Sequence, residues 1–242
     1  MCRRLFQIQR STPVVLPRPA IDNKIETALS GNLAGVLILP GSFQSGKSTW
    51  LLDFHQRNRR TTAYHPFYED DAELQREPYF VKSIAMQLAA LTEVSSVSTS
   101  AREVDSCVKL GEFIAALGSM LNGRDVLILL YGIDQSGALL DRIMTLLRQY
   151  LQSDTRPLRW VLTVRAPSPA LLALRGLPCS SVIPSFDDES CALEFIQSYL
   201  AAASCDCPKP GDLASEVYEQ AGSNIILMRR VVRCIQEAID AG

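Results

Sequence analysis

The sequence has few histidines, and this limits the chemistry open to the protein. Only His55 and His65 occur in 242 residues, so a zinc site or a Ser-His-Asp triad has little material. The seven cysteines are an odd number, are scattered along the chain, and show no Cys-x-x-Cys spacing. They therefore predict reduced thiols in a cytosolic protein, rather than a disulfide framework or a metal site.

Long apolar runs and an excess of basic charge are also missing. No segment approaches the roughly 18 apolar residues of a membrane span, and the basic N-terminus lacks the apolar stretch of a signal peptide. The net charge is −2 and the pI is near 5.8, which does not suggest the broad basic surface of a nucleic-acid-binding protein. We expect a soluble cytoplasmic protein with no membrane partner, and the composition does not support nucleic acid as a partner.

The most informative segment follows an apolar strand at about 34–40. It reads Gly-x-x-x-x-Gly-Lys-Ser over residues 41–48, and a helix is predicted from Ser48 to about Arg57. In this pattern the glycines allow a tight loop whose N–H groups surround phosphates, the lysine reaches the β- and γ-phosphate oxygens, and the serine hydroxyl ligates Mg²⁺. The N-terminus of the following helix adds favourable electrostatics for an anion.

A nucleoside triphosphate site is therefore predicted, with Ser48 as a Mg²⁺ ligand. The side chains of Phe43 and Gln44 are expected to point away from the phosphates. The residues assigned to the nucleotide are Gly41, Ser42, Phe43, Gln44, Ser45, Gly46, Lys47, Ser48 and Thr49.

Strands and helices alternate along the rest of the chain, which is typical of a three-layer α/β fold with a parallel sheet. After residue 186 the strand patterns stop, and helices are predicted up to about 202, at 211–221 and at 225–239. Residues 93–106 are rich in Ser and Thr and predict a surface loop. The further strands are expected at 61–67, 125–130, 158–164 and 181–183, and the further helices at 20–30, 78–92, 108–122 and 136–152.

This pattern divides the chain into three parts. Residues 1–30 form a leader and a helix, residues 31–186 form a P-loop NTPase core, and residues 187–242 form a small helical lid. About 80 residues separate Lys47 from the strand that begins near Leu127. That spacing fits an additional-strand P-loop ATPase better than a small kinase or a Ras-like GTPase, and no Asn-Lys-x-Asp motif for guanine follows.

Several segments, taken in order, resemble the NACHT-type members of the STAND class of signalling NTPases. Besides the P-loop, two of them are residues 64–67 with 78–88, which end in Gln-Leu, and residues 127–135, an apolar strand with an acidic end. The others are residues 160–165, a strand that ends in Arg, and residues 221–226, within the expected lid. The resemblance covers about residues 15–240. It implies ATP, with GTP as the alternative, together with Mg²⁺, a protein partner or self-association, and lid motion as the output.

The sequence departs from this family where the Mg²⁺-associated aspartate is expected, because Tyr131 stands there and Gln135 occupies the last acidic position. A phenol does not replace a carboxylate on a hard dication. The resemblance leaves Asp134 as the catalytic carboxylate and second Mg²⁺ ligand, beside Lys47, and makes Arg165 a sensor of the γ-phosphate. Hydrolysis, if it occurs, should be slow, since Lewis-acid stabilisation is worth several kcal/mol.

Other interpretations of the same residues stay open. Arg165 could instead close a strand end beside an Asp or Glu. The acidic run 69–71 is better explained as a solvated loop than as a source of carboxylate for the nucleotide. The alternative function is a catalytically inactive nucleotide-binding interaction module, and an ATPase acting on nucleic acid is less favoured.

Overall fold

The computed structural model describes most of the chain between residues 35 and 182 and parts of both ends. The described residues are 22–23, 25, 27–28, 35–42, 45–92, 95–118, 120–121, 125–153, 158–177, 180–182, 193–194, 196–198, 210–221, 224, 227–228, 230–232, 234 and 237. None of the helices among them is long and apolar enough to cross a lipid bilayer.

A five-stranded sheet with the order β2-β3-β4-β1-β5 forms the centre of the fold. Every pair of neighbouring strands is parallel. The strand β4 lies between β1, which enters the glycine-rich loop, and β3. The strands are β1 (Val36–Gly41), β2 (Thr62–Pro66), β3 (Val126–Tyr131), β4 (Leu158–Arg165) and β5 (Ser180–Val182).

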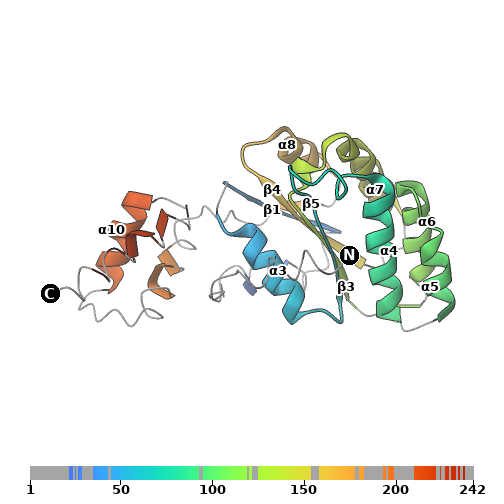
Figure 1. Ribbon diagram of the computed structural model, residues 1–242, viewed down its shortest axis with the longest axis horizontal. Coiled ribbons are helices and arrows are strands. Elements are labelled where there is room, and N and C mark those ends of the chain that lie inside the picture. The colour runs from blue at the N-terminus through green and yellow to red at the C-terminus, as the bar shows by residue number, and fades with distance from the viewer. Residues whose placement is uncertain are drawn as a thin grey trace.

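Helices cover both faces of this sheet (Figure 1). Figure 1 shows α3 on one side of the strands and α4 to α7 on the other. The helices of the core are α3 (Lys47–Arg57), α4 (Glu77–Thr92), α5 (Ser95–Arg102), α6 (Cys107–Leu117), α7 (Leu140–Gln152) and α8 (Pro169–Arg175). The predicted α/β architecture with a parallel sheet is therefore confirmed.

The alternation of side chains along β1 explains the two layers of core. Val36 and Ile38 belong to the large apolar cluster beneath α4 to α8. Leu37 and Leu39 belong to a second cluster on the other face, with Trp50, Leu51 and Phe54 of α3. Successive side chains of a strand point to opposite faces, and a strand covered on both faces must be apolar throughout.

The prediction of a loop over 93–106 was wrong, because α5 spans Ser95–Arg102. Val97, Ala101 and Val104 are buried in the large cluster, so one face of a helix rich in serine packs on the core. The short helix α8 was not predicted, although Ser168 caps it and Pro169 begins it, which is a standard helix start. The helix expected from 136 begins only at Leu140, after two 3₁₀ turns, Ile133–Gln135 and Gly137–Leu139.

The C-terminal helices have a small apolar core of their own. Helix α10 (Pro210–Ala221) contributes Ala214, Val217 and Ala221. Ile196, Met228 and Val232 complete this cluster. The residues around the expected boundary at 186–187 lie outside the described part, so the assignment of 187–242 as a lid stays a prediction.

The outer edge of β2 is closed by a side chain of α4. The Gln87 amide accepts a hydrogen bond from Tyr64 N (2.9 Å) and donates one to Tyr64 O (2.9 Å). An edge strand presents unpaired N–H and C=O groups, and this amide satisfies both of them at Tyr64 as a neighbouring strand would. The next residue, Leu88, is fully buried in the core. The Gln-Leu pair therefore joins the helix to the sheet by hydrogen bonds and by packing.

Replacing Gln87 by alanine should lower the free energy of unfolding by about 1–3 kcal/mol, the usual cost of leaving buried polar groups unpaired. Tyr64 is buried, so water reaches its backbone poorly. Gln149→Ala is the matched control, because Gln149 is an exposed glutamine within α7. Urea unfolding of both variants measures the effect, and equal stability of the two would contradict it.

Candidate functional site

The glycine-rich loop joins the end of β1 to the start of α3. Gly46 has a φ of 89° and directly precedes the helix, a left-handed conformation that favours glycine. The first hydrogen bond of the helix runs from Trp50 N to Gly46 O (2.9 Å). Ser48 and Thr49 are half-buried in the first helical turn. Phe43 and Gln44 lie outside the described residues.

Gly41 is required by close packing within this loop. A Cβ at position 41 would lie 2.8 Å from Ser45 Oγ, 3.2 Å from Lys47 Cδ and 3.3 Å from Lys47 Nζ. The absence of a side chain at Gly41 therefore makes room for the lysine to cross the loop. Gly41 also pairs in register with Arg165 of β4.

The ammonium of Lys47 is bound by the loop itself. Its Nζ donates to Gly41 O (2.6 Å), Ser42 O (2.6 Å) and Ser45 Oγ (3.1 Å). Only 7% of the residue is exposed. The loop thus holds a buried cation at the carboxyl end of β1 and the N-terminus of α3, where backbone amides and the helix dipole favour an anion.

Arg165 ends β4 beside Gly41 and binds carboxylates from two other segments. Its backbone N–H donates to Asp134 Oδ1 (3.0 Å), and its Nε pairs with Asp134 Oδ2 (3.1 Å). Its Nη2 pairs with Glu69 Oε2 (3.2 Å). The structure therefore contains the arrangement that the alternative interpretation of Arg165 describes, an arginine at a strand end beside acidic groups.

Tyr131 occupies the end of β3, where the resemblance would place an aspartate. Its ring lies 5.6 Å from the ring of Tyr68, and it packs against the apolar cluster beneath α3. The next residue, Gly132, has a φ of 67°, and its N–H donates to Thr163 Oγ1 (2.9 Å). The turn after β3 is thus fixed to β4 by a hydrogen bond. The residue that precedes this turn, Tyr131, is aromatic.

Two glutamines hold the loop that follows β2. Gln135 Oε1 accepts a hydrogen bond from Glu69 N (3.0 Å). Gln75 Nε2 donates to Tyr68 O (2.7 Å). Gln135, at the position where the resemblance predicts an acid, therefore anchors the backbone of an acidic residue in the loop after β2.

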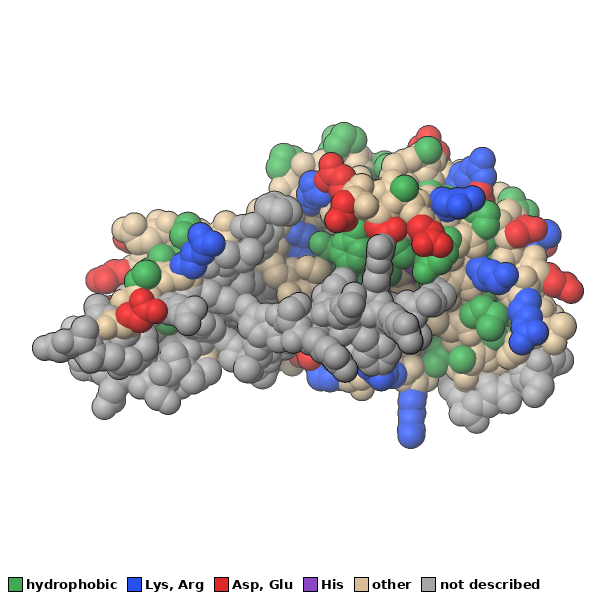
Figure 2. Space-filling view, in the orientation of Figure 1, with side chains coloured by type: hydrophobic (Ala, Val, Ile, Leu, Met, Phe, Trp, Pro, Cys, Tyr) green, Lys and Arg blue, Asp and Glu red, His purple; other side chains and the backbone are tan. Residues whose placement is uncertain are grey.

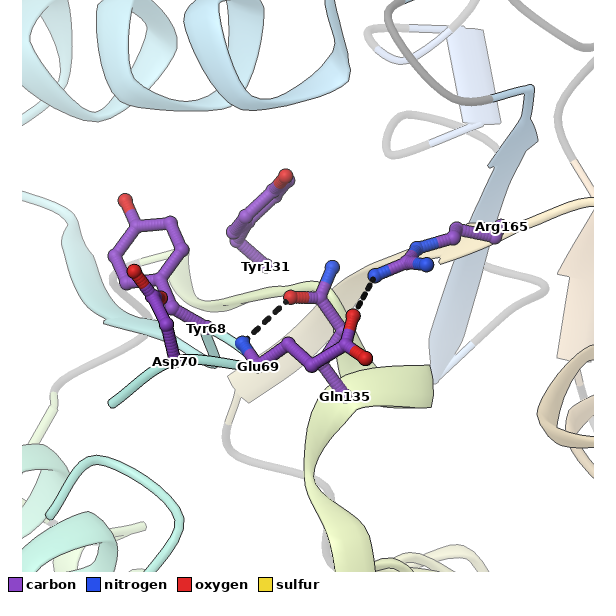
Figure 3. A pocket seen from close by; sticks show the side chains of 6 residues that line it. All are labelled: Tyr68, Glu69, Asp70, Tyr131, Gln135 and Arg165. Atoms are coloured by element: carbon purple, nitrogen blue, oxygen red, sulfur yellow. Dashed lines mark hydrogen bonds and ion pairs between the residues drawn. The ribbon is translucent and has the colours of Figure 1, made fainter. Parts of the chain in front are cut away.

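These strand ends surround an open pocket of about 460 Å³. Figure 3 shows Arg165 facing the Glu69 carboxylate, with Tyr131 near Gln135. The walls are formed by Tyr68, Glu69, Asp70, Tyr131, Gln135 and Arg165. The pocket lies at the carboxyl ends of β2, β3 and β4, the edge where ligands bind in open α/β sheets. Burial raises the pKa of Tyr68, and the neighbouring Tyr131 adds to this, so the phenol is neutral at pH 7.

The residues present fit a triphosphate better than a protein-held Mg²⁺. The glycine cradle and Lys47 suit phosphate oxygens. No group of three or more His, Cys, Asp or Glu side chains in the described part of the chain could hold a metal ion. Both oxygens of Asp134 are bonded to Arg165, and Tyr131 offers no carboxylate. Magnesium at this site would rely on Ser48 and on the phosphates themselves.

The structure brings the predicted residues together to different extents. Lys47 lies with Gly41, Ser42 and Ser45 in one hydrogen-bonded loop. Arg165 joins Asp134 at the neighbouring strand end. Sequence reasoning assigned no role to Tyr68 or Thr163 and favoured a plain surface loop for Glu69, yet Tyr68 and Glu69 line the pocket. Their position directly after β2, at the carboxyl edge of a parallel sheet, was the available signal.

Comparison with solved structures shows a likeness to Walker-type P-loop ATPases. The chain is similar to the Walker-type ATPase paby2304 of Pyrococcus abyssi, with a TM-score of 0.55 and 16% identity, covering 94% of this chain and 74% of that one. A weaker match, with a TM-score of 0.40 and 11% identity, is to a chain of the Escherichia coli MS115-1 HORMA:CdnC:Trip13 complex, covering 83% of this chain and 73% of that one. The first likeness shows a shared fold and nothing about activity.

Sequence comparison adds no assignment. A scan against models of known protein families finds no match, and a search of curated proteins finds none either.

Proposed function

We propose that the protein binds a nucleoside triphosphate, ATP in particular, in the loop Gly41–Thr49. The observation that carries this proposal is the buried ammonium of Lys47, the first residue of α3, which is held by Gly41 O, Ser42 O and Ser45 Oγ. An incoming phosphate would replace these oxygens as the partner of the cation and would gain the loop amides. The likeness to a Walker-type ATPase supports the same assignment.

The proposed activity is slow hydrolysis in a STAND-like switch. The strand order, with β4 between β1 and β3, supports the additional-strand class of P-loop ATPases. Bound Mg²⁺ would neutralise charge on the phosphates, but the chain offers the metal few ligands besides Ser48. The C-terminal helices would close on the nucleotide and report its state to a protein partner, through different affinities of the open and closed forms.

A second function is favoured by Tyr131. A tyrosine packed against the cluster beneath α3 suits a catalytically inactive module in which the nucleotide is structural. The nucleic-acid-associated ATPase is less favoured, because acidic and basic side chains are interspersed over the described surface in view (Figure 2).

Calorimetric titration of the purified protein with ATP and GTP, each with and without Mg²⁺, tests the proposal. We expect ATP to bind, and its affinity to change less than about threefold when Mg²⁺ is removed, because the chain offers Mg²⁺ mainly a serine hydroxyl. Phosphate release in the same samples separates the slow ATPase from the inactive module. The absence of binding by either nucleotide would refute both functions.

A further inference from the structure

The loop after β2 is more tightly fixed than a solvated turn requires. Phe67 N donates to Tyr131 O (2.8 Å), which extends the pairing with β3 beyond the end of β2. The two glutamine contacts at Tyr68 O and Glu69 N follow. His65 binds Leu74 O through Nε2 (3.0 Å). A carbonyl only accepts, so Nε2 carries the proton, and burial lowers the pKa of His65 to about 4, which keeps the ring neutral.

This fixed backbone directs the Glu69 carboxylate toward Arg165 at the end of β4. The Glu69 side chain is 81% exposed, yet it reaches Arg165, the residue in register with Gly41. Figure 3 shows the carboxylate on the Arg165 side of the pocket and Asp70 on the other side, next to Tyr68. A group beside Arg165 is near the point where the outermost phosphate of a bound nucleotide would emerge from the loop.

The segment after β3 offers no comparable base. Tyr131 and Gln135 are not carboxylates. Asp134 has one oxygen bonded to the backbone N–H of Arg165 and the other to its guanidinium. A backbone N–H cannot move away when ligand binds, so Asp134 is committed to holding the strand end.

We propose that Glu69 is the catalytic base of this protein, and that Gln135 and Gln75 position it; this inference rests on the proposed hydrolysis of ATP. The catalytic carboxylate that the resemblance places after β3 would thus come from the loop after β2. Gln135 provides the link, because it stands at the expected acidic position and binds the backbone of Glu69.

In this step Glu69 accepts a proton from a water molecule as its oxygen attacks the γ-phosphorus. The bond between the γ-phosphorus and the bridging oxygen breaks, and its electron pair leaves with the diphosphate. Inorganic phosphate is released, and the proton passes from Glu69 to solvent. In the structure Arg165 pairs with Glu69. The γ-phosphate competes for that guanidinium, so nucleotide binding would release the carboxylate to act.

The test compares Glu69→Gln with the wild-type protein under single turnover. We expect hydrolysis to fall about 100-fold, within the usual contribution of general-base catalysis. ATP affinity should not fall, because Glu69 does not hold the phosphates and its neutralisation leaves Arg165 available to them. Formate should restore part of the activity of Glu69→Ala. Glu73→Gln is the matched control, since Glu73 is exposed in the same loop, and it should hydrolyse ATP at the wild-type rate.

Each result separates this inference from the proposed function. If Glu69→Gln hydrolyses ATP as fast as the wild-type protein, Glu69 is not the base and the ATPase assignment stands. If the wild-type protein binds ATP without turnover, the catalytic role is refuted and the inactive module is favoured. If the wild-type protein binds no nucleotide, the proposed function itself fails.

Discussion

Lys47→Ala is expected to bind ATP about 100 to 1,000 times more weakly than the wild-type protein, and to lose hydrolysis with it. The wild-type ammonium is buried against Gly41 O, Ser42 O and Ser45 Oγ. Hydrogen bonds to charged groups contribute about 1.5–3 kcal/mol each. Loss of the cation from a triphosphate site therefore removes roughly 3–4 kcal/mol, since each 1.4 kcal/mol is a factor of ten in affinity.

The fold should survive this substitution. Gly41 O keeps a hydrogen bond from Ala166 N (3.1 Å), and the strand pairing of β1 with β4 does not involve the lysine side chain. Lys47→Met keeps the aliphatic stem and should lose ATP equally, which separates the charge from packing. Lys82→Ala, at an exposed lysine of α4, should bind like the wild-type protein. Wild-type affinity in Lys47→Ala would remove the main support for the nucleotide site.

Tyr131→Asp is expected to raise the rate of ATP hydrolysis about 10- to 100-fold if the wild-type protein is a weakened enzyme. The substitution places a carboxylate at the end of β3, where it can bind Mg²⁺ directly or through water. Metal stabilisation of the transferring phosphoryl group is worth several kcal/mol, and each 1.36 kcal/mol is tenfold in rate. The affinity for ATP should at the same time become dependent on Mg²⁺.

Tyr131→Asn is the control for this gain, because it removes the same ring and has nearly the shape of aspartate without its charge. Both variants lose the contact with Tyr68, so the melting temperature should fall by a similar amount in each. An equal rate of hydrolysis in the two variants would show that charge at position 131 does not limit turnover. If neither variant hydrolyses ATP, the inactive nucleotide-binding module is the better description.

The parts of the fold that the sequence predicted well are those with a local cause. The apolar run of β3 and the glycine pattern between β1 and α3 need no distant contact to be recognised. Helix α5 was missed because its stabilisation is not local: Val97 and Ala101 are apolar positions in a segment rich in serine, and their burial against α4 and the large cluster decides the outcome. Tertiary packing commonly outweighs weak intrinsic propensity in this way.

The sequence by itself predicted the glycine-rich loop, because the spacing of Gly41, Gly46 and Lys47 fixes which backbone groups and which cation can meet. It also established that Tyr131 breaks the acidic pattern after β3. Only the tertiary structure decided which residues share the pocket. The strand order brings β4 between β1 and β3, and Arg165 thereby meets Asp134 and Glu69, which lie far apart in the chain. Such contacts depend on how strands pair across the sheet, and local sequence patterns do not determine that pairing.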